Sequence, residues 1–412
     1  MSDIKIKAIS KNIKGEIVLT AGKSESNRVL MIRALCGEEF EIENLALAKD
    51  TRTMRRLLSS KGVIKDVGPA GTTMRFLTAY YANTPGEYIL TGSERMKNRP
   101  IKILVDALKS LGAEIAYMEK EGCPPLKIAG KPLNGGKVVI DGSVSSQYLS
   151  ALIMIAPTLK GGLELELVGK IASVPYLRMT LELIKDFGVN YTWEGQIIRI
   201  PEGTYQAKPH VIEADWSAAS YWYQIAALAQ DANLEVIGLK ENSLQGDSAI
   251  VKIFEQLGVL TTFHQDRIVL RKIPNFKLPS ELVYDFSDCP DVAQTLAATV
   301  AGLGIGGSFT GLESLRIKET DRIEAIKKEL GKFNIAVEIL GEDAIKILPG
   351  VLKRPKKAIA TYDDHRVAMS IAPLCLCLEE EIELEDEEVV AKSYPDYWKD
   401  LSAVGLVSEL IS

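Results

Sequence analysis

Hydrophobic and polar positions along the chain recur at intervals of about seventy residues. Six amphipathic helical patterns end in a large residue, then glycine or asparagine, then an apolar residue. The central residues of successive endings are 50, 76, 70, 76 and 71 residues apart. Glycine or asparagine at this point is expected to close a helix in the left-handed conformation. The pattern therefore predicts a unit repeated six times, with endings at Lys61-Gly62-Val63, Leu111-Gly112-Ala113, Phe187-Gly188-Val189, Leu257-Gly258-Val259, Phe333-Asn334-Ile335 and Val404-Gly405-Leu406.

Two short β-type stretches separated by a turn follow several of these endings. They span residues 189–192 with 197–200, 261–263 with 268–270, and 336–339 with 345–348. Each unit therefore contains helices and a few strands, which predicts an α/β or α+β fold. After Gly62, however, the next helical pattern begins almost at once, at Gly71-Thr72. We therefore expect one repeat to lack its strand pair.

Five predicted helices begin with polar groups that suit anions. A first turn offers unpaired backbone N–H groups and the positive end of the helix dipole. Arg or Lys accompanies several of these starts, which favours ligands with several negative charges. A capped, solvated first turn would explain any one of them, but five together favour binding. The starts are Lys23-Ser24-Glu25-Ser26-Asn27-Arg28, Gly71-Thr72-Thr73-Met74-Arg75, Ser145-Ser146-Gln147, Lys318-Glu319-Thr320-Asp321-Arg322 and Asp363-Asp364-His365-Arg366.

Composition narrows the function classes. The net charge of −6 argues against a nucleic-acid binder, which is usually basic, and makes the cationic motifs local exceptions. No apolar run reaches the length of a membrane span, and the first residues do not read as a signal peptide. Five cysteines without metal-type spacing and only three histidines argue against a metal site. We expect a cytoplasmic protein that contacts neither membrane nor nucleic acid.

Two of the helix starts carry groups suited to phosphate. Lys23 precedes Ser24, a plausible N-cap, and Arg28 lies one turn further along the same helix. Ser145 and Ser146 add two hydroxyls to a helix start, although simple capping would explain that pair as well.

Other candidate groups have chemistry of their own. Pro175 starts a helix that leaves Ser173 and Tyr176 able to face a ligand. Asp291 stands at the start of an apolar helix, where it could be a base or simply a carboxylate stabilised by the helix dipole.

Glu319 lies between Lys318 and Arg322, whose charges favour its ionised form. A carboxylate close to a lysine can also serve as a proton-transfer pair. No serine or cysteine nucleophile is evident beside His365, so this residue is interpreted as orienting a ligand. Lys392 adds a last cation before the C-terminal helix.

Together these motifs resemble the 5-enolpyruvylshikimate-3-phosphate synthase family. The resemblance runs from Lys23-Ser24 to Lys392-Ser393-Tyr394-Pro395-Asp396-Tyr397, and the segments 316–322 and 364–366 are its most specific parts. It implies an α/β, two-domain enolpyruvyl transferase fold with six βαβαββ repeats in pseudo-threefold domains, one repeat being shortened. The first, discontinuous domain would take residues 1–21 and 215–412 and the second would take 22–214, with the active site in the cleft between them.

The resemblance also implies a reaction and its residues. The enolpyruvyl group of phosphoenolpyruvate would pass to the 5-hydroxyl of shikimate 3-phosphate in a monomer without metal or organic cofactor. Asp291 would be the base for the hydroxyl, and Glu319 with Lys23 the acid–base pair for the methylene carbon and departing phosphate. Shikimate 3-phosphate would contact Lys23, Ser24, Arg28, Ser145, Ser146, Gln147, Ser173, Tyr176, Asp291, Ser314, Lys318 and His365. Phosphoenolpyruvate, or the inhibitor glyphosate, would contact Lys23, Gly71, Arg99, Gln147, Arg322, Arg366 and Lys392, with Arg75 in support.

The sequence departs from the family pattern at two further positions. Pro69 stands where most members have asparagine, and Ser314 stands where an asparagine usually lies near the shikimate phosphate. Neither change removes a proposed catalytic group.

Two alternatives remain at this point. The related transferase acting on UDP-N-acetylglucosamine carries a reactive cysteine in a mobile loop, and no cysteine here lies in a comparable polar loop, since Cys123 precedes Pro124-Pro125. A non-catalytic anion-binding protein of the same fold would not need to keep Lys23, Asp291 and Glu319.

Overall fold

The structure is a computed structural model, and it describes residues 2–143, 145–171 and 173–411. The chain forms two units. Unit 1 consists of Met1–Ala21 and Glu213–Ser412, and unit 2 consists of Gly22–Ile212. The chain therefore starts in unit 1, passes through all of unit 2, and returns.

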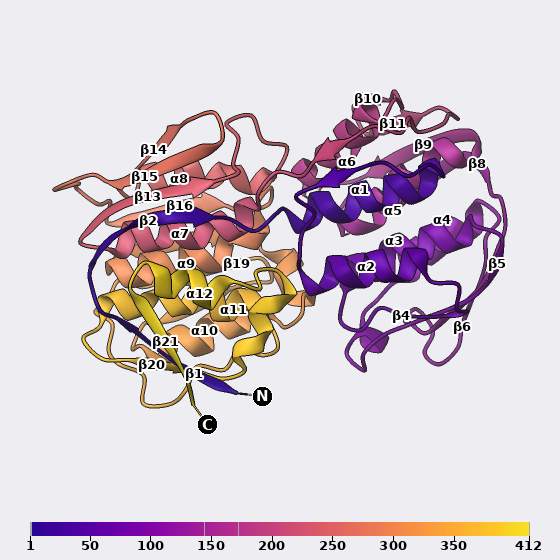
Figure 1. The fold of residues 1–412 in the computed structure, drawn as a ribbon. Coiled ribbons are helices and arrows are strands. Elements are labelled where there is room, and N and C mark those ends of the chain that lie inside the picture. The colour runs from indigo at the N-terminus through magenta and orange to yellow at the C-terminus, as the bar shows by residue number, and fades with distance from the viewer. Residues whose placement is uncertain (1, 144, 172, 412) are drawn as a thin grey trace. The chain divides into compact units, whose positions relative to one another are not determined.

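Both units repeat the order strand, helix, strand, helix, strand, strand (Figure 1). In every complete four-stranded sheet the spatial order is first, second, fourth, third. The first two strands are parallel, as a helical crossover requires, and the last two form an antiparallel hairpin. The α/β class and the repeated unit predicted from the sequence are confirmed.

Unit 2 contains two complete repeats. The first consists of β4 (Ile64–Asp66), α3 (Gly71–Ala82), β5 (Gly86–Thr91), α4 (Lys102–Ser110), β6 (Glu114–Tyr117) and β7 (Leu126–Gly130). The second consists of β8 (Asn134–Asp141), α5 (Ser146–Ile155), β9 (Lys160–Val168), α6 (Val174–Asp186), β10 (Thr192–Glu194) and β11 (Ile197–Ile200).

Unit 1 also contains two repeats of this kind. One consists of β2 (Asn12–Val18), α7 (Trp216–Leu228), β13 (Asp231–Ile237), α8 (Ile250–Glu255), β14 (Val259–Phe263) and β15 (Arg267–Lys272). The other consists of β16 (Glu281–Asp285), α9 (Ala293–Leu303), β17 (Gly306–Thr310), α10 (Arg322–Lys332), β18 (Val337–Leu340) and β19 (Ala344–Ile347).

The third repeat of unit 1 joins the two ends of the chain. It contains α11 (His365–Ile371), β20 (Ile382–Leu384), α12 (Tyr397–Ala403) and β21 (Leu406–Ile411), and its fourth strand is β1 (Asp3–Ala8). A parallel bridge from Ile359 to Leu384 stands in place of a first strand. Strand β1 pairs with β20 on one side and with β21 on the other, where Asp3 lies opposite Ile411.

The shortened repeat lies in unit 2. It consists of β12 (His210–Val211), α1 (Lys23–Cys36), β3 (Ile42–Glu43) and α2 (Lys49–Ser59), and its sheet has two strands. Residues 60–63, which the structure describes, contain no strand between α2 and β4. The predicted absence of one strand pair is therefore confirmed. Just beyond it, the buried Lys65 ammonium donates to the Ser60 carbonyl and lies 5.1 Å from the centre of the Tyr81 ring.

Five of the six predicted helix endings are confirmed in detail. Gly112, Gly188, Gly258, Asn334 and Gly405 all have φ between 67° and 94°. The sixth prediction was wrong at Gly62, whose φ is not positive. There the helix α2 stops at Ser59, and the Ser60 N–H bonds back to the Leu57 carbonyl. Without a strand pair to enter, the chain does not need the sharp left-handed turn.

The first helix of each repeat is the buried one. In unit 2, α1, α3 and α5 contact one another, as a pseudo-threefold arrangement requires. Helices α5, α7 and α9 are apolar around their whole circumference and almost completely buried. Their N-terminal turns are the exception, and they carry the polar groups described below. Among the described residues, none of the helices has the length and apolar character that spanning a membrane would take.

Candidate active site

Arg322 is the centre of a polar cluster in unit 1. It is the first residue of α10 and is only 1% exposed. Its guanidinium donates to Asp364 at 2.8 Å, to Asp291 at 3.0 Å and to Glu319 at 2.9 Å. Burial disfavours the charge, but the carboxylates of Asp364, Glu319 and Asp291 together raise the pKa of Arg322 above its usual value. Arg322 therefore stays positive and holds the three carboxylates in fixed positions.

Asp291 lies among three cations. It belongs to a 3-10 turn, Pro290–Val292, that leads into α9. Its Oδ1 lies 3.0 Å from Arg322 Nη1 and 3.4 Å from Lys318 Nζ, and its Oδ2 lies 3.2 Å from Arg366 Nη2. These charges favour the ionised carboxylate. An anion that bound to the same cations would compete with Asp291 for them and leave its carboxylate more able to accept a proton.

The start of α11 positions Arg366 and His365. Asp364 is the N-cap, and its Oδ1 accepts a hydrogen bond from the Arg366 N–H at 2.9 Å. The same carboxylate holds Arg322, so one residue fixes the starts of both α10 and α11. His365 is buried, and its Nδ1 lies 4.0 Å from Asp364.

Two other predicted residues lie elsewhere in unit 1. Lys392 ends a 3-10 helix, Glu387–Lys392, and its ammonium contacts both the carboxylate and the carbonyl of Asp363 at 2.5 Å. The Ser314 hydroxyl is buried and has no hydrogen-bond partner among the residues that the structure describes. A ligand oxygen could therefore complete its bonding.

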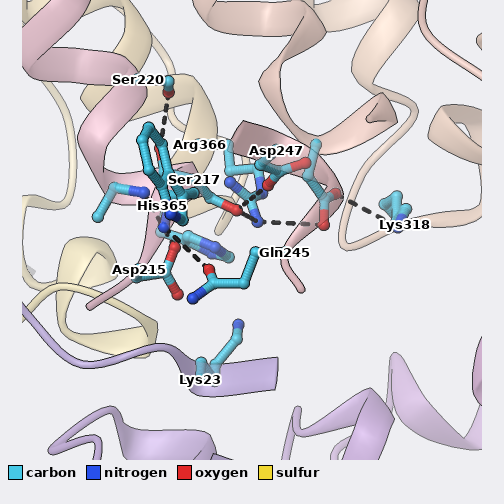
Figure 2. A network of polar contacts seen from close by, with 12 residues as sticks. Lys23, Asp215, Ser217, Ser220, Gln245, Asp247, Lys318, His365 and Arg366 are labelled. Carbon is cyan, nitrogen blue, oxygen red and sulfur yellow. Dashed lines mark hydrogen bonds and ion pairs between the residues drawn. The ribbon is translucent and has the colours of Figure 1, made fainter. Parts of the chain in front are cut away.

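Two residues of this cluster were missed by the sequence reasoning. The Ser217 hydroxyl, in the first turn of α7, accepts from Arg366 Nη2 at 3.3 Å and donates to the Asp247 carboxylate (Figure 2). Burial, helped by the charge of Asp291, raises the pKa of Asp247 to about 7. Neither residue stands beside a cation in the sequence, so no motif signalled them. The polar start of α7, Asp215-Trp216-Ser217, was the only available sign.

Lys23 is the first residue of α1 in unit 2. Its Nζ lies 3.5 Å from Asp50 Oδ2, and both side chains are largely buried. The N-cap of α1 is Gly22, so the prediction that Ser24 caps this helix was wrong. Ser24 lies inside the first turn, where its carbonyl accepts from Arg28 at 2.9 Å. The chain enters unit 2 at Gly22, which has an extended conformation. Its carbonyl accepts from the Ser26 N–H, so it occupies the N-cap position without a side-chain hydrogen bond.

Arg28 is buried, and its hydrogen bonds within the described part of the chain go to hydroxyl and carbonyl oxygens. Its Nε donates to Thr180 at 2.7 Å, one Nη2 bond reaches Ser150 at 3.0 Å, and another reaches the Tyr176 carbonyl at 3.5 Å. Burial lowers its pKa to about 10, so it remains charged at neutral pH. Arg28 therefore joins α1 to α5 and α6 and places a positive charge beside the start of α1.

Gly71 begins α3 and lies against two guanidinium groups. A β-carbon there would be 2.7 Å from Arg99 Nη1 and 3.0 Å from Arg75 Nη1. Arg75 donates to the Gly71 carbonyl at 3.0 Å and to the Pro100 carbonyl at 3.3 Å. The Arg99 Nε is buried and has no hydrogen-bond partner within the described part of the chain. The absence of a side chain at Gly71 thus lets two cations reach the first turn of α3.

The starts of α5 and α6 carry the remaining candidates. Ser145 is the N-cap of α5, Ser146 is its first residue, and Gln147 donates to the Thr72 hydroxyl at 3.1 Å. This bond joins the start of α5 to that of α3. Ser173 caps α6 with a φ of 54°, which is uncommon for a residue other than glycine. Tyr176 follows in the first turn of α6 and donates its N–H to the Ser173 carbonyl at 3.1 Å.

Most of the predicted residues in each unit therefore lie at or near helix starts, and Arg99, Ser314 and Lys392 are the exceptions. The cluster in unit 2 is dominated by cations and hydroxyls, and the cluster in unit 1 alternates cations with carboxylates. The first can bind anionic oxygens, and the second can also transfer protons. Among the described residues, no three His, Cys, Asp or Glu side chains are grouped as metal ligands.

Comparison with known proteins identifies relatives over almost the whole chain. The family model for EPSP synthase (3-phosphoshikimate 1-carboxyvinyltransferase) matches residues 7–64 and 55–401. A 3-phosphoshikimate 1-carboxyvinyltransferase of Bacteroides fragilis is 47% identical over 396 residues, which cover 95% of this chain and 96% of the relative. One from Histophilus somni is 37% identical over 440 residues, which cover 98% of this chain and 99% of the relative.

A solved structure agrees with the fold. EPSP synthase from Acinetobacter baumannii aligns over 100% of both chains with a TM-score of 0.80 at 22% sequence identity. At that identity the likeness supports the fold, and the assignment to a family rests on the sequence relatives.

Proposed function

Because the chain belongs to the EPSP synthase (3-phosphoshikimate 1-carboxyvinyltransferase) family, we propose that its two polar clusters bind shikimate 3-phosphate and phosphoenolpyruvate. The protein is a transferase of the shikimate pathway, in aromatic amino-acid biosynthesis. We also propose that phosphoenolpyruvate donates the enolpyruvyl group, and that the protein is a monomer located in the cytoplasm. The single observation that carries the assignment of the two clusters is the contact of the Asp291 carboxylate with three cations, Lys318, Arg322 and Arg366. An anionic substrate can bind to the same cations.

Shikimate 3-phosphate is assigned to the hydroxyls and cations at the starts of α1, α5 and α6. Two hydroxyls and the free N–H groups at Ser145-Ser146 suit its phosphate. Arg28 holds these three helices together, and we assign Ser173 and Tyr176 to contacts with the substrate, with Tyr176 packing on its ring. In unit 1, Asp291, Ser314, Lys318 and His365 complete this set.

Phosphoenolpyruvate is assigned to the cations around Gly71 and at the start of α11. Its phosphate and carboxylate need several positive charges, which Lys23, Arg99, Arg322, Arg366 and Lys392 supply. Gln147 and Arg75 support this set through their contacts with Thr72 and Gly71. The proposal requires residues of both units to reach the same substrates.

The proton transfers are assigned to three residues. Asp291 takes the proton from the 5-hydroxyl of shikimate 3-phosphate. The oxygen of that hydroxyl at the same time bonds to the central carbon of phosphoenolpyruvate. Lys23 and Glu319 form the acid–base pair that first protonates the methylene carbon and later removes a proton from the resulting methyl group. The second step breaks the carbon–oxygen bond to phosphate and releases it. Arg322 holds Glu319 at 2.9 Å throughout, which fixes the direction in which that carboxylate acts.

An assay of phosphate release tests this assignment. Phosphate is expected only when shikimate 3-phosphate and phosphoenolpyruvate are both present. Asp291→Ala should remove most of the rate, by about 10²–10⁴-fold. Phosphate release with UDP-N-acetylglucosamine in place of shikimate 3-phosphate would instead support the related transferase. Binding of both anions without turnover would support a non-catalytic relative.

A further inference from the structure

The loop between β13 and α8 is fastened to the start of α7. Gln245 on this loop accepts from the Trp216 N–H at 2.9 Å and donates to the Ala214 carbonyl at 2.7 Å. Glu213 binds the same loop by accepting from the Lys240 N–H at 2.9 Å and from the Ser243 hydroxyl at 2.6 Å. The loop ends at Asp247, in the 3-10 turn Gly246–Ala249. The hydrogen bonds of Gln245 and Glu213 therefore fix the position of Asp247 relative to α7.

Asp247 reaches the site cluster through one hydroxyl. Its Oδ2 accepts from Ser217, whose Oγ accepts from Arg366 Nη2 at 3.3 Å (Figure 2). The same Nη2 lies 3.2 Å from Asp291. Arg366 therefore stands between two carboxylates, one contacted directly and one through Ser217.

The carboxylate of Asp247 is incompletely bonded. It is 4% exposed, and its Oδ1 is buried with no hydrogen-bond partner among the described residues. A buried carboxylate oxygen without a donor favours the protonated group. Among the described residues, Asp291 and Asp215 disfavour a negative charge on Asp247, and Arg366 favours it. The Cys289 thiol also faces Asp247 but is uncharged at neutral pH, because burial and the charge of Asp247 raise its pKa.

An anion bound at Arg366 changes this balance. The positive charge of Arg366 lowers the pKa of Asp247, and an anion bound nearby raises it. The charge of the cluster can be restored if a proton from water moves onto the Asp247 carboxylate. No other bond needs to form or break.

We propose that Asp247 is a positioning residue, which holds Arg366 through Ser217 and takes up a proton from solvent when substrate anions bind to the cluster. The inference rests on the proposed function, because it takes Arg366, Lys318 and Asp291 to contact those anions. With Asp247 neutral, the positive charge of Arg366 is left for the substrate.

Calorimetry with phosphoenolpyruvate alone, the substrate assigned to Arg366, tests this proposal, because no turnover occurs without shikimate 3-phosphate. The heat of binding is measured at pH 7.5 in buffers with different ionisation enthalpies, which gives the number of protons taken up. Asp247 in the free protein is mostly ionised at that pH. The wild type should therefore take up more protons than Asp247→Asn, by up to about 0.7 per site. Protonation of the substrate phosphate is common to both proteins and cancels in the difference.

Two further variants complete the comparison. Asp266→Asn removes an equally negative but exposed side chain of unit 1, and its proton uptake should match that of the wild type. Ser217→Ala removes the bridge, and it should raise the KM for phosphoenolpyruvate with little change in kcat. A role in stability alone would not change the proton count.

The outcomes separate this inference from the proposed function. Equal proton uptake by wild type and Asp247→Asn would overturn the inference, and so would an unchanged KM in Ser217→Ala. Absence of phosphoenolpyruvate binding to the wild type would overturn the proposed function instead. If Asp247→Asn does not fold, Asp247→Ser provides the same comparison with a smaller neutral side chain.

Discussion

Gly71 and Arg99 approach each other so closely that a β-carbon on the glycine would be 2.7 Å from the Arg99 Nη1 atom. Arg75 lies almost as near, at 3.0 Å. Even a methyl group at residue 71 would therefore push both guanidinium groups, which are flexible enough to move away. The positions of Arg75 and Arg99, which we propose to bind substrate, thus depend on the absence of a side chain at residue 71.

This contact predicts how the protein responds to glyphosate. We expect competitive inhibition against phosphoenolpyruvate, and Gly71→Ala should weaken it at least about tenfold, or about 1.4 kcal/mol. Substrate binding should change less. Gly62→Ala is the matched control, because its β-carbon would meet only the Ser60 hydroxyl at 3.6 Å. Inhibition constants for the three proteins check this, and equal inhibition of all three would show that the α3 start does not hold the inhibitor.

The buried pair of Arg322 and Asp364 predicts a large effect on stability. Asp364→Ala leaves a buried guanidinium without its strongest partner and should lower the free energy of unfolding by about 3–5 kcal/mol. Glu342→Ala removes the exposed partner of Arg316 and should cost less than about 1 kcal/mol. Urea unfolding followed by circular dichroism measures both. Similar midpoints for the two variants would mean that the buried pair adds little.

The proposed acid–base role of Glu319 predicts that a substitution there affects turnover without affecting substrate binding. Glu319→Gln keeps the shape of the side chain but cannot exchange its proton, so kcat should fall by about 10²–10⁴-fold. Binding of shikimate 3-phosphate should survive. Glu338→Gln, at an exposed position of the same unit, is the control. Near-normal turnover in Glu319→Gln would assign the proton transfer to another residue.

The raised pKa of Asp247 predicts how stability varies with pH. The group has a pKa of about 7 in the folded protein and an ordinary value of 3.8. Between these values the folded state binds more protons than the unfolded state, so stability falls as pH rises through this window. Asp247→Asn should match the wild type near pH 4 and melt at a higher temperature near pH 8. Asp266→Asn should show no such gain, and melting curves across the range decide between these outcomes.

The sequence was informative where a local rule determines the structure. Helix endings at Gly112 or Asn334 could be predicted because a left-handed residue is needed there whatever surrounds it. The predicted ending at Gly62 failed because the following strands, which normally require that turn, are missing. The start of α1 was misassigned for a similar reason. Serine is a favoured N-cap residue, but the chain enters unit 2 at Gly22 and helix α1 already begins at Lys23. Ser24 therefore lies inside the helix.

Contacts between segments that are distant in the chain could not be predicted from the sequence. Asp364 and Arg322 are both in recognisable motifs, yet nothing in either motif shows that the cap of one helix holds the first residue of another. Asp247 and Ser217 are thirty residues apart and meet only because Gln245 ties their segments together. Their importance comes from burial, which a single sequence does not reveal for a polar residue.

The pairing of β1 with β21 also determines an order in time. During synthesis, Asp3 leaves the ribosome long before Ile411, so the sheet that joins them cannot close until Ile411 has been made. The segment from Gly22 to Ile212, by contrast, contains all three repeats of its own unit, so we expect it to fold before unit 1 is complete. Strands β1 and β2 of unit 1 are made before unit 2, but the strands with which they pair are made after it. Because such long-range pairing slows folding, we expect unit 1 to complete its fold after unit 2.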